Sequence, residues 1–273
     1  MKKATYLLAA YCVLAACTAK ETSDASRCFR YEGTTDTLGI SLSVELPCGG
    51  DAVSVSVRSS LLDVLYKDID CIGYGLDPVG IKPFDYASSN PEDAVCYYGK
   101  TAREKISSIA SESETQIPWE LSCSLSRVRS TDKYWVFLSQ DYVYMGGAHG
   151  GVSGAGYLTF NRSDGSLLTE IIDRSKVAAL QPVLRRGLLE YFRDDCGEKE
   201  VTPQNLDEYL LLGGEDIPLP VWEPYPGEDG LTFTYQQYEV APYAAGMPAF
   251  TVSYEEIGKF LSPAAASLLL SSL

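Results

Sequence analysis

The chain of 273 residues has one histidine and far fewer basic than acidic residues. With 22 lysines and arginines against 37 aspartates and glutamates, its net charge is −15, and we expect no nucleic-acid partner because phosphate binding needs clustered cations. There is no Cys-x-x-Cys pair and no cysteine–histidine cluster, so we expect no metal and no cofactor. No apolar run reaches the ~20 residues that a membrane-spanning helix needs.

An apolar stretch at the start predicts a signal peptide over residues 1–16. Two lysines precede the apolar residues 6–16, which have the length of a signal-peptide core. Residues 14–17, Leu-Ala-Ala-Cys, resemble the lipobox of bacterial lipoproteins. We therefore expect lipidation of Cys17, a tether over residues 17–27, and a protein held in the cell envelope by its lipid alone, periplasmic or surface-exposed. The alternative is an ordinary secretory signal with an incidental cysteine.

Six cysteines remain once Cys12 leaves with the signal peptide and Cys17 carries lipid. An even number in an exported chain predicts disulfide bonds, and the sequence does not choose among the possible pairings. Cys28 and Cys48 flank a predicted hairpin centred near Leu38-Gly39 and form one candidate pair. The disulfide candidates are Cys28, Cys48, Cys71, Cys96, Cys123 and Cys196.

Hydrophobic periodicity predicts an α+β fold, with antiparallel sheets and a few packed amphipathic helices in two subdomains. The body of about 255 residues is large enough for one large domain or two small ones. Alternating or fully apolar runs predict strands over 40–46, 53–57, 119–125, 134–144, 157–160, 231–236 and 250–254. Helical spacing predicts helices over 61–69, 95–109 and 176–192, and a short one from residue 255.

Three segments resemble motifs of a family of bacterial envelope proteins. Residues 142–150 are similar to a Y-x-Y-x-G-G-A-H loop, 158–169 to a strand and turn, and 233–250 to a Y-x-x-Y-E-I-A-P-Y-A-x-G block. Together they resemble the paired domains of unknown function DUF4163 and DUF3298. That pair forms the outer part of a lysozyme-sensing anti-sigma factor and accompanies some peptidoglycan deacetylase domains. The resemblance implies a DUF4163-like domain over 28–160 and a DUF3298-like domain over 161–273. We expect neither regulated cleavage of a spanning protein nor the deacetylase's metal chemistry to carry over.

Two loops supply the candidate ligand-binding residues. In the first, glycines permit positive φ and close approach of a partner. The lone histidine either forms hydrogen bonds or transfers protons at an open groove, or it stabilises the loop. In the second, Pro242 and Gly246 predict a bend, whose tyrosines either pack beneath it or face a ligand. Its glutamate is either a buried acceptor or a surface acid. The ligand-binding candidates are Tyr144, Gly146, Gly147, His149, Tyr238, Glu239 and Tyr243.

The residues favour a binding protein over an enzyme, and we predict no catalytic residue. The sequence around Ser153 approaches the nucleophile elbow of serine hydrolases, but Ala155 replaces the second glycine and a strand, not a helix, is expected to follow. The family resemblance implies a lysozyme-like protein or cell-wall material such as peptidoglycan as partner. The alternative is an envelope hydrolase acting on peptidoglycan or another glycan.

Overall fold

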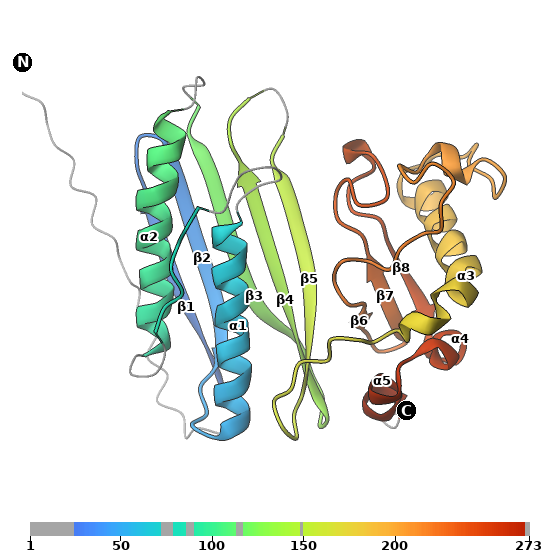
Figure 1. The fold of residues 1–273 in the computed structure, drawn as a ribbon, viewed down its shortest axis with the longest axis horizontal. Coiled ribbons are helices and arrows are strands. Elements are labelled where there is room, and N and C mark those ends of the chain that lie inside the picture. The colour runs from blue at the N-terminus through green and yellow to red at the C-terminus, as the bar shows by residue number, and fades with distance from the viewer. Residues whose placement is uncertain (1–24, 72–78, 86–89, 113–116, 148–149, 271–273) are drawn as a thin grey trace, which may run out of the picture. The chain divides into compact units, whose positions relative to one another are not determined.

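The computed structural model describes residues 25–71, 79–85, 90–112, 117–147 and 150–270. The predicted signal peptide, Cys17 as the predicted lipidation site, and the lone histidine His149 lie outside these ranges. The chain packs into two units (Figure 1). Unit 1 is the chain up to Ser126 together with Gln140–Val152, and unit 2 is Arg127–Ser139 together with Ser153–Leu273.

The predicted α+β class is confirmed. The described strands are β1 Ser26–Thr34, β2 Leu38–Pro47, β3 Trp119–Ser130, β4 Tyr134–Tyr144, β5 Val152–Asn161, β6 Tyr225–Pro226, β7 Gly230–Thr234 and β8 Ala249–Ser253. The described α-helices are α1 Ala52–Asp70, α2 Pro91–Ser111, α3 Val177–Glu190, α4 Tyr254–Ile257 and α5 Pro263–Leu269. One sheet has the order β1-β2-β3-β4-β5 and the other the order β6-β7-β8. Within the described ranges, no helix combines the length and apolar character needed to cross a membrane.

In unit 1, helices α1 and α2 pack against the first strands of the larger sheet (Figure 1). β1 and β2 form the predicted antiparallel hairpin. β2 and β3, however, pair in parallel, with Leu38 opposite Trp119, which differs from the purely antiparallel sheet that we expected. The physical reason is the long connection through α1 and α2, which returns the chain to the same end of the sheet before β3 begins.

The strand predicted over residues 53–57 is wrong, because these residues form the first turns of α1. Asp51 caps the helix, and its Oδ1 accepts a hydrogen bond from the Ser54 amide at 3.0 Å. Val57 is followed at intervals of four by Leu61, Leu65 and Ile69, and all four are fully buried. Alternation over five residues alone does not distinguish a strand from the start of such a helix.

The predicted disulfide framework stays a prediction. In the structure the six candidate cysteines are not joined to one another. In the register of β1 and β2, Cys28 lies opposite Glu45 and not opposite Cys48, because the hairpin turns over residues 35–37. Cys123 is buried in unit 1, and this burial raises the pKa of its thiol well above the usual range. The observed register therefore does not place Cys28 opposite Cys48, so it gives no support to this candidate bridge.

Unit 2 contains the smaller sheet and α3 to α5. Helix α3 packs on β8, and Leu184 and Leu188 join a core that includes Phe233 and Phe250. Gly187 of α3 lets the Phe250 ring approach, since a β-carbon there would lie 2.2 Å from it. The helix and strands predicted for this part of the chain are confirmed. The division into domains at residue 160 remains a prediction.

Candidate functional site

The glycine loop after β4 belongs to unit 1 and is stabilised by its own tyrosine. The Tyr144 hydroxyl donates to the Gly147 carbonyl at 3.1 Å. Gly146 and Gly147 have φ values of 76° and 117°, the left-handed region that favours glycine. Space remains around Gly147, where an added β-carbon would meet no atom within 4 Å. The structure thus joins Tyr144 to Gly147, while His149 lies outside the described residues.

The second motif forms a loop in unit 2 over residues 235–246, which we call the tyrosine loop. Tyr235, the first residue of the loop, is buried in the core, and its hydroxyl donates to the Pro218 carbonyl at 2.9 Å. Burial raises the pKa of this hydroxyl well above the usual range. Tyr238, in contrast to the buried Tyr235, has 53% of its surface exposed. Its ring centroid is 5.7 Å from that of Tyr243, so these two candidates lie together.

Tyr238 also has an unusual backbone. Its φ is 66°, and among the described residues it is the one non-glycine residue with a positive value. Such a conformation costs a residue with a β-carbon about 1–2 kcal/mol, so the surrounding contacts must impose it.

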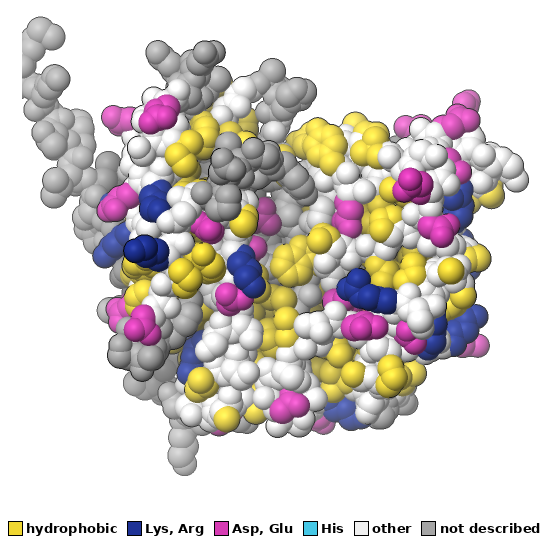
Figure 2. All heavy atoms as spheres, in the orientation of Figure 1, with side chains coloured by type: hydrophobic (Ala, Val, Ile, Leu, Met, Phe, Trp, Pro, Cys, Tyr) yellow, Lys and Arg dark blue, Asp and Glu magenta, His cyan; other side chains and the backbone are white. Residues whose placement is uncertain are grey.

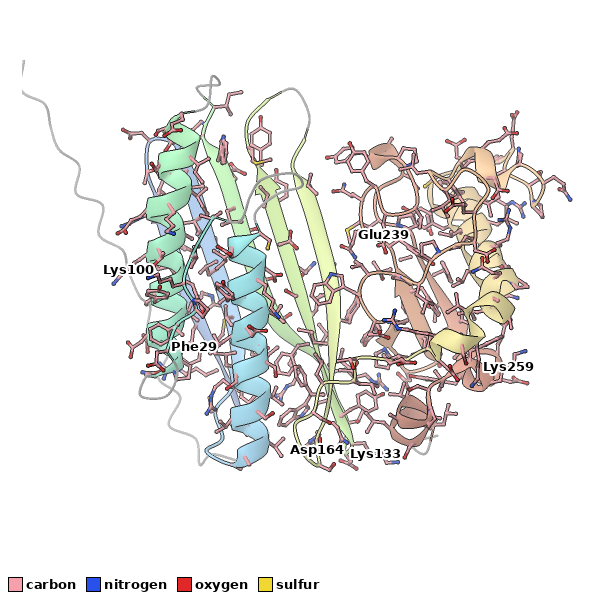
Figure 3. All side chains as sticks on the ribbon, viewed as in Figure 1. Phe29, Lys100, Lys133, Asp164, Glu239 and Lys259 are labelled. Atoms are coloured by element: carbon pink, nitrogen blue, oxygen red, sulfur yellow. The ribbon has the colours of Figure 1, made fainter. Side chains whose placement is uncertain are left out.

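Glu239 contributes to the contacts that constrain the backbone of Tyr238. Its Oε1 accepts from the Val221 amide at 2.6 Å, and its Oε2 accepts from the Gln236 amide at 2.7 Å. The carboxylate is half-buried among the loops of unit 2 (Figure 3). Burial raises its pKa, and the two backbone hydrogen bonds offset that in part. Of the two roles left open by the sequence, Glu239 therefore takes that of an internal acceptor that joins two loops.

Two glutamines beside Tyr238 bind the strand β5, which ends the order of the larger sheet. The Gln236 side chain accepts from the Ala155 amide at 2.9 Å and donates to the Ala155 carbonyl at 2.8 Å, as a neighbouring strand would. Gln237 accepts from the Ser153 amide at 2.9 Å. These bonds satisfy edge groups that otherwise attract another strand. They also place Ser153 inside β5, not at a strand-to-helix turn, so the nucleophile-elbow interpretation has no structural basis.

Trp222 adds a further contact to β5. A β-carbon at Gly156 would lie 2.1 Å from the Trp222 indole, so the ring packs directly on the Gly156 backbone. Sequence reasoning missed Gln236, Gln237 and Trp222, and it had no spacing signal by which to find them. Together with Glu239, they hold the tyrosine loop in one conformation.

Apolar side chains are exposed on the segments joined to this loop. Val221, whose amide binds Glu239, is 72% exposed, and Leu211, whose amide donates to the Val240 carbonyl at 2.9 Å, is 54% exposed. Figure 2 shows hydrophobic side chains exposed over the loops of unit 2. We call Leu211, Val221 and Tyr238, together with the half-buried Tyr243, the exposed loop surface. Exposed apolar groups that gather on ordered loops mark binding sites more often than single ones do.

Acidic residues dominate this part of the chain. Between residues 194 and 240 there are twelve aspartates and glutamates and one basic residue, Lys199. Glu208, Glu215 and Asp216 are among those that are exposed. The negative charge of such a stretch attracts positively charged groups. Across the ranges that the structure describes, no three histidine, cysteine or acidic side chains come together as metal ligands would.

Comparison with known proteins bears on the same segment. Residues 177–255 match the DUF3298 family, whose description is "Protein of unknown function". The match contains the whole tyrosine loop and confirms that part of the predicted resemblance. The pairing with DUF4163 remains a prediction.

Two solved structures share the fold of the chain. One is a member of the DUF3298 family from Bacteroides fragilis, with a TM-score of 0.67 and 20% identity over 92% of this chain and 100% of that one. The other is a DUF3298 family protein from Pseudomonas aeruginosa, with a TM-score of 0.58 and 12% identity over 89% of this chain and 96% of that one. No curated protein matches the chain. At these identities the likeness establishes the fold alone.

Proposed function

We propose that this chain is a lipid-anchored binding protein of the cell envelope that captures a basic, lysozyme-like protein through the exposed loop surface. The observation that carries the proposal is the exposure of Leu211, Val221 and Tyr238 on loops that Glu239 and Gln236 hold in place. A surface prepared in this way loses little conformational entropy on binding.

The chemistry of the surface favours a protein partner over a glycan. Leu211 and Val221 offer no hydrogen bonds to sugar hydroxyls, whereas aliphatic and tyrosine side chains together are typical of protein interfaces. Tyr238 is the expected anchor, because its ring is exposed and its backbone is constrained. The acidic surroundings complement a basic partner.

Binding, and not catalysis, accounts best for the polar groups of this site. Both oxygens of Glu239 accept hydrogen bonds from backbone amides, which leaves this carboxylate poorly placed to transfer protons. Ser153 lies within β5, with its amide bonded to Gln237. These contacts support a binding surface with a fixed shape.

The test is biolayer interferometry of the purified full-length chain with lysozyme, at low salt and at about 0.15 M salt, where the Debye length falls to about 8 Å. We expect binding that persists at the higher salt and weakens at least about tenfold in Tyr238→Asn and Val221→Ser. Asparagine is chosen because it tolerates a positive φ. The matched control is Val55→Ser, since Val55 is an exposed valine on α1 and should leave binding unchanged.

Absence of binding, or binding that disappears with salt, would overturn the proposal. If the protein binds soluble peptidoglycan fragments and not lysozyme, its partner is a glycan and the proposed protein partner is wrong.

The anchor has its own test. We propose that Cys17 bears the lipid, because Leu14-Ala15-Ala16-Cys17 follows a short apolar run. Cells grown with a labelled fatty acid should incorporate the label into the wild-type protein and not into Cys17→Ser. Equal labelling of both proteins would exclude this site.

A further inference from the structure

A second candidate site lies in unit 2, on elements other than the tyrosine loop. It is a cavity of about 430 Å³ next to the turn that joins β3 to β4. Three segments line it, namely residues 129–134, the Gly227-Glu228 turn after β6, and Tyr254 with Leu269 from the C-terminal helices. Its volume lies in the range of pockets that hold small molecules.

The cavity contains an arginine that binds a tyrosine and forms no ion pair with the two acids of the lining, Asp132 and Glu228. The Arg129 Nε donates to the Tyr134 hydroxyl at 3.2 Å. Burial lowers the pKa of Arg129, but interactions with the hydroxyls of Tyr134 and Tyr225 outweigh burial and raise it overall. Among the described residues, Arg129 forms no ion pair. Arg129 is partly exposed where it lines the cavity.

The groups around Arg129 are rigid. Thr131 accepts at its Oγ1 from the Tyr134 amide at 3.0 Å, and Arg162 donates to the Thr131 carbonyl at 2.5 Å, so the β3–β4 turn is fixed from both sides. The Tyr254 hydroxyl donates to the Gly227 carbonyl at 3.0 Å, which fixes the opposite wall. Lys133, at the end of the same turn, adds a second cation to the lining (Figure 3). The site is therefore formed before any ligand arrives.

We propose that this cavity binds a small organic carboxylate, with the Arg129 guanidinium facing the carboxylate oxygens. A guanidinium matches a carboxylate with two parallel hydrogen bonds, which a lone phosphate-binding lysine does not provide. The tyrosine rings and Leu269 supply apolar walls for the body of the ligand. Asp132 and Glu228 also line the cavity, and both are exposed, so they select against ligands with a large negative charge.

Two sources of carboxylate fit this chemistry, an acidic sugar and the carboxyl end of a short peptide. Isothermal titration calorimetry of the full-length chain distinguishes them with N-acetylmuramic acid and D-alanyl-D-alanine as probes. The neutral amide of each probe tests the need for the charge, and inorganic phosphate tests the class of anion. Circular dichroism and the melting temperature report whether each variant folds.

We expect one of the two acids to bind and its amide to bind at least about tenfold more weakly, as the loss of charge-assisted hydrogen bonds implies. Arg129→Gln should weaken binding by a similar factor. The matched control, Arg30→Gln, removes an exposed strand arginine of unit 1 and should change nothing. If Arg129→Gln fails to fold, Arg129→Lys keeps the charge, loses the planar fork, and should still weaken binding.

Four results would overturn the inference. They are no binding of either acid, equal binding of an amide, tighter binding of phosphate than of both acids, and wild-type affinity in the folded Arg129 variants. None of these results bears on lysozyme capture, which depends on Tyr238 and Val221.

Discussion

Replacing Glu239 by alanine should detach two loops of unit 2 from each other. The carboxylate accepts from the Val221 amide at 2.6 Å and from the Gln236 amide at 2.7 Å. A hydrogen bond to a charged group contributes about 1.5–3 kcal/mol. Because Glu239 is half-buried, water replaces part of each bond, and the lower value applies to both. The expected loss in the free energy of unfolding is about 3 kcal/mol.

Urea unfolding followed by tryptophan fluorescence measures this loss, since Trp222 lies beside the affected segment. The midpoint should fall while the slope of free energy against urea stays unchanged. The matched control is Glu215→Ala, which removes an exposed acid from the same acidic stretch. It should alter the free energy of unfolding by less than about 0.5 kcal/mol.

An equal effect of Glu239→Ala and Glu215→Ala would refute the reasoning. The carboxylate would then not hold the tyrosine loop, and the constrained backbone of Tyr238 would need another cause. Lysozyme binding by the folded Glu239→Ala protein gives a second reading, because a loosened loop should bind more weakly than the fixed one.

Three further predictions follow. Gly187→Ala gains about 1 kcal/mol of helix propensity, but the new β-carbon would lie 2.2 Å from the Phe250 ring. The variant should therefore be less stable than the wild type by about 1–2 kcal/mol in the same urea assay. A variant more stable than the wild type would contradict this packing. Burial raises the pKa of Glu239 above its ordinary value of 4.5, so the folded state holds this proton more tightly than the unfolded state does. Its contribution to stability should be largest below pH 4.5 and decline as the pH rises through the raised pKa, and Glu239→Gln should flatten that decline; an identical pH profile would argue against it. The exposed Cys71 should react with iodoacetamide within minutes, while the buried Cys123, whose thiol pKa is raised by burial, should react only on unfolding; a disulfide-linked Cys123 peptide in a non-reducing digest would show the thiol assignment to be wrong.

The long periodic elements were predictable from the sequence because one face of each is buried along its whole length. α2 is such a case, with Val95, Tyr98, Ala102 and Ile106 buried at helical spacing. The strand predicted over 53–57 is wrong because its pattern is short and because Asp51 caps a helix that begins at Ala52. Pairing of β2 with β3 in parallel could not be read from either strand, since strand direction depends on the connection between them.

The candidate sites divide in the same way. Tyr238, Glu239 and Tyr243 came from a motif. The structure places the two tyrosine rings side by side, and Glu239 accepts hydrogen bonds from two backbone amides. Gln236 and Arg129 gave no signal, because a glutamine in a loop and an arginine near a strand end have ordinary neighbours in the chain.

By itself, the sequence determined the α+β class, most strands and helices, the acidic charge, and the loop that bears the exposed tyrosine. These properties depend on residues close together in the chain, where periodicity and turn chemistry act. Only the tertiary structure decided that Cys28 lies opposite Glu45, that Glu239 joins two loops, and that Arg129 lines a cavity with tyrosines. Each depends on groups brought together from distant segments, and burial, register and hydrogen bonding act there only after the chain has packed.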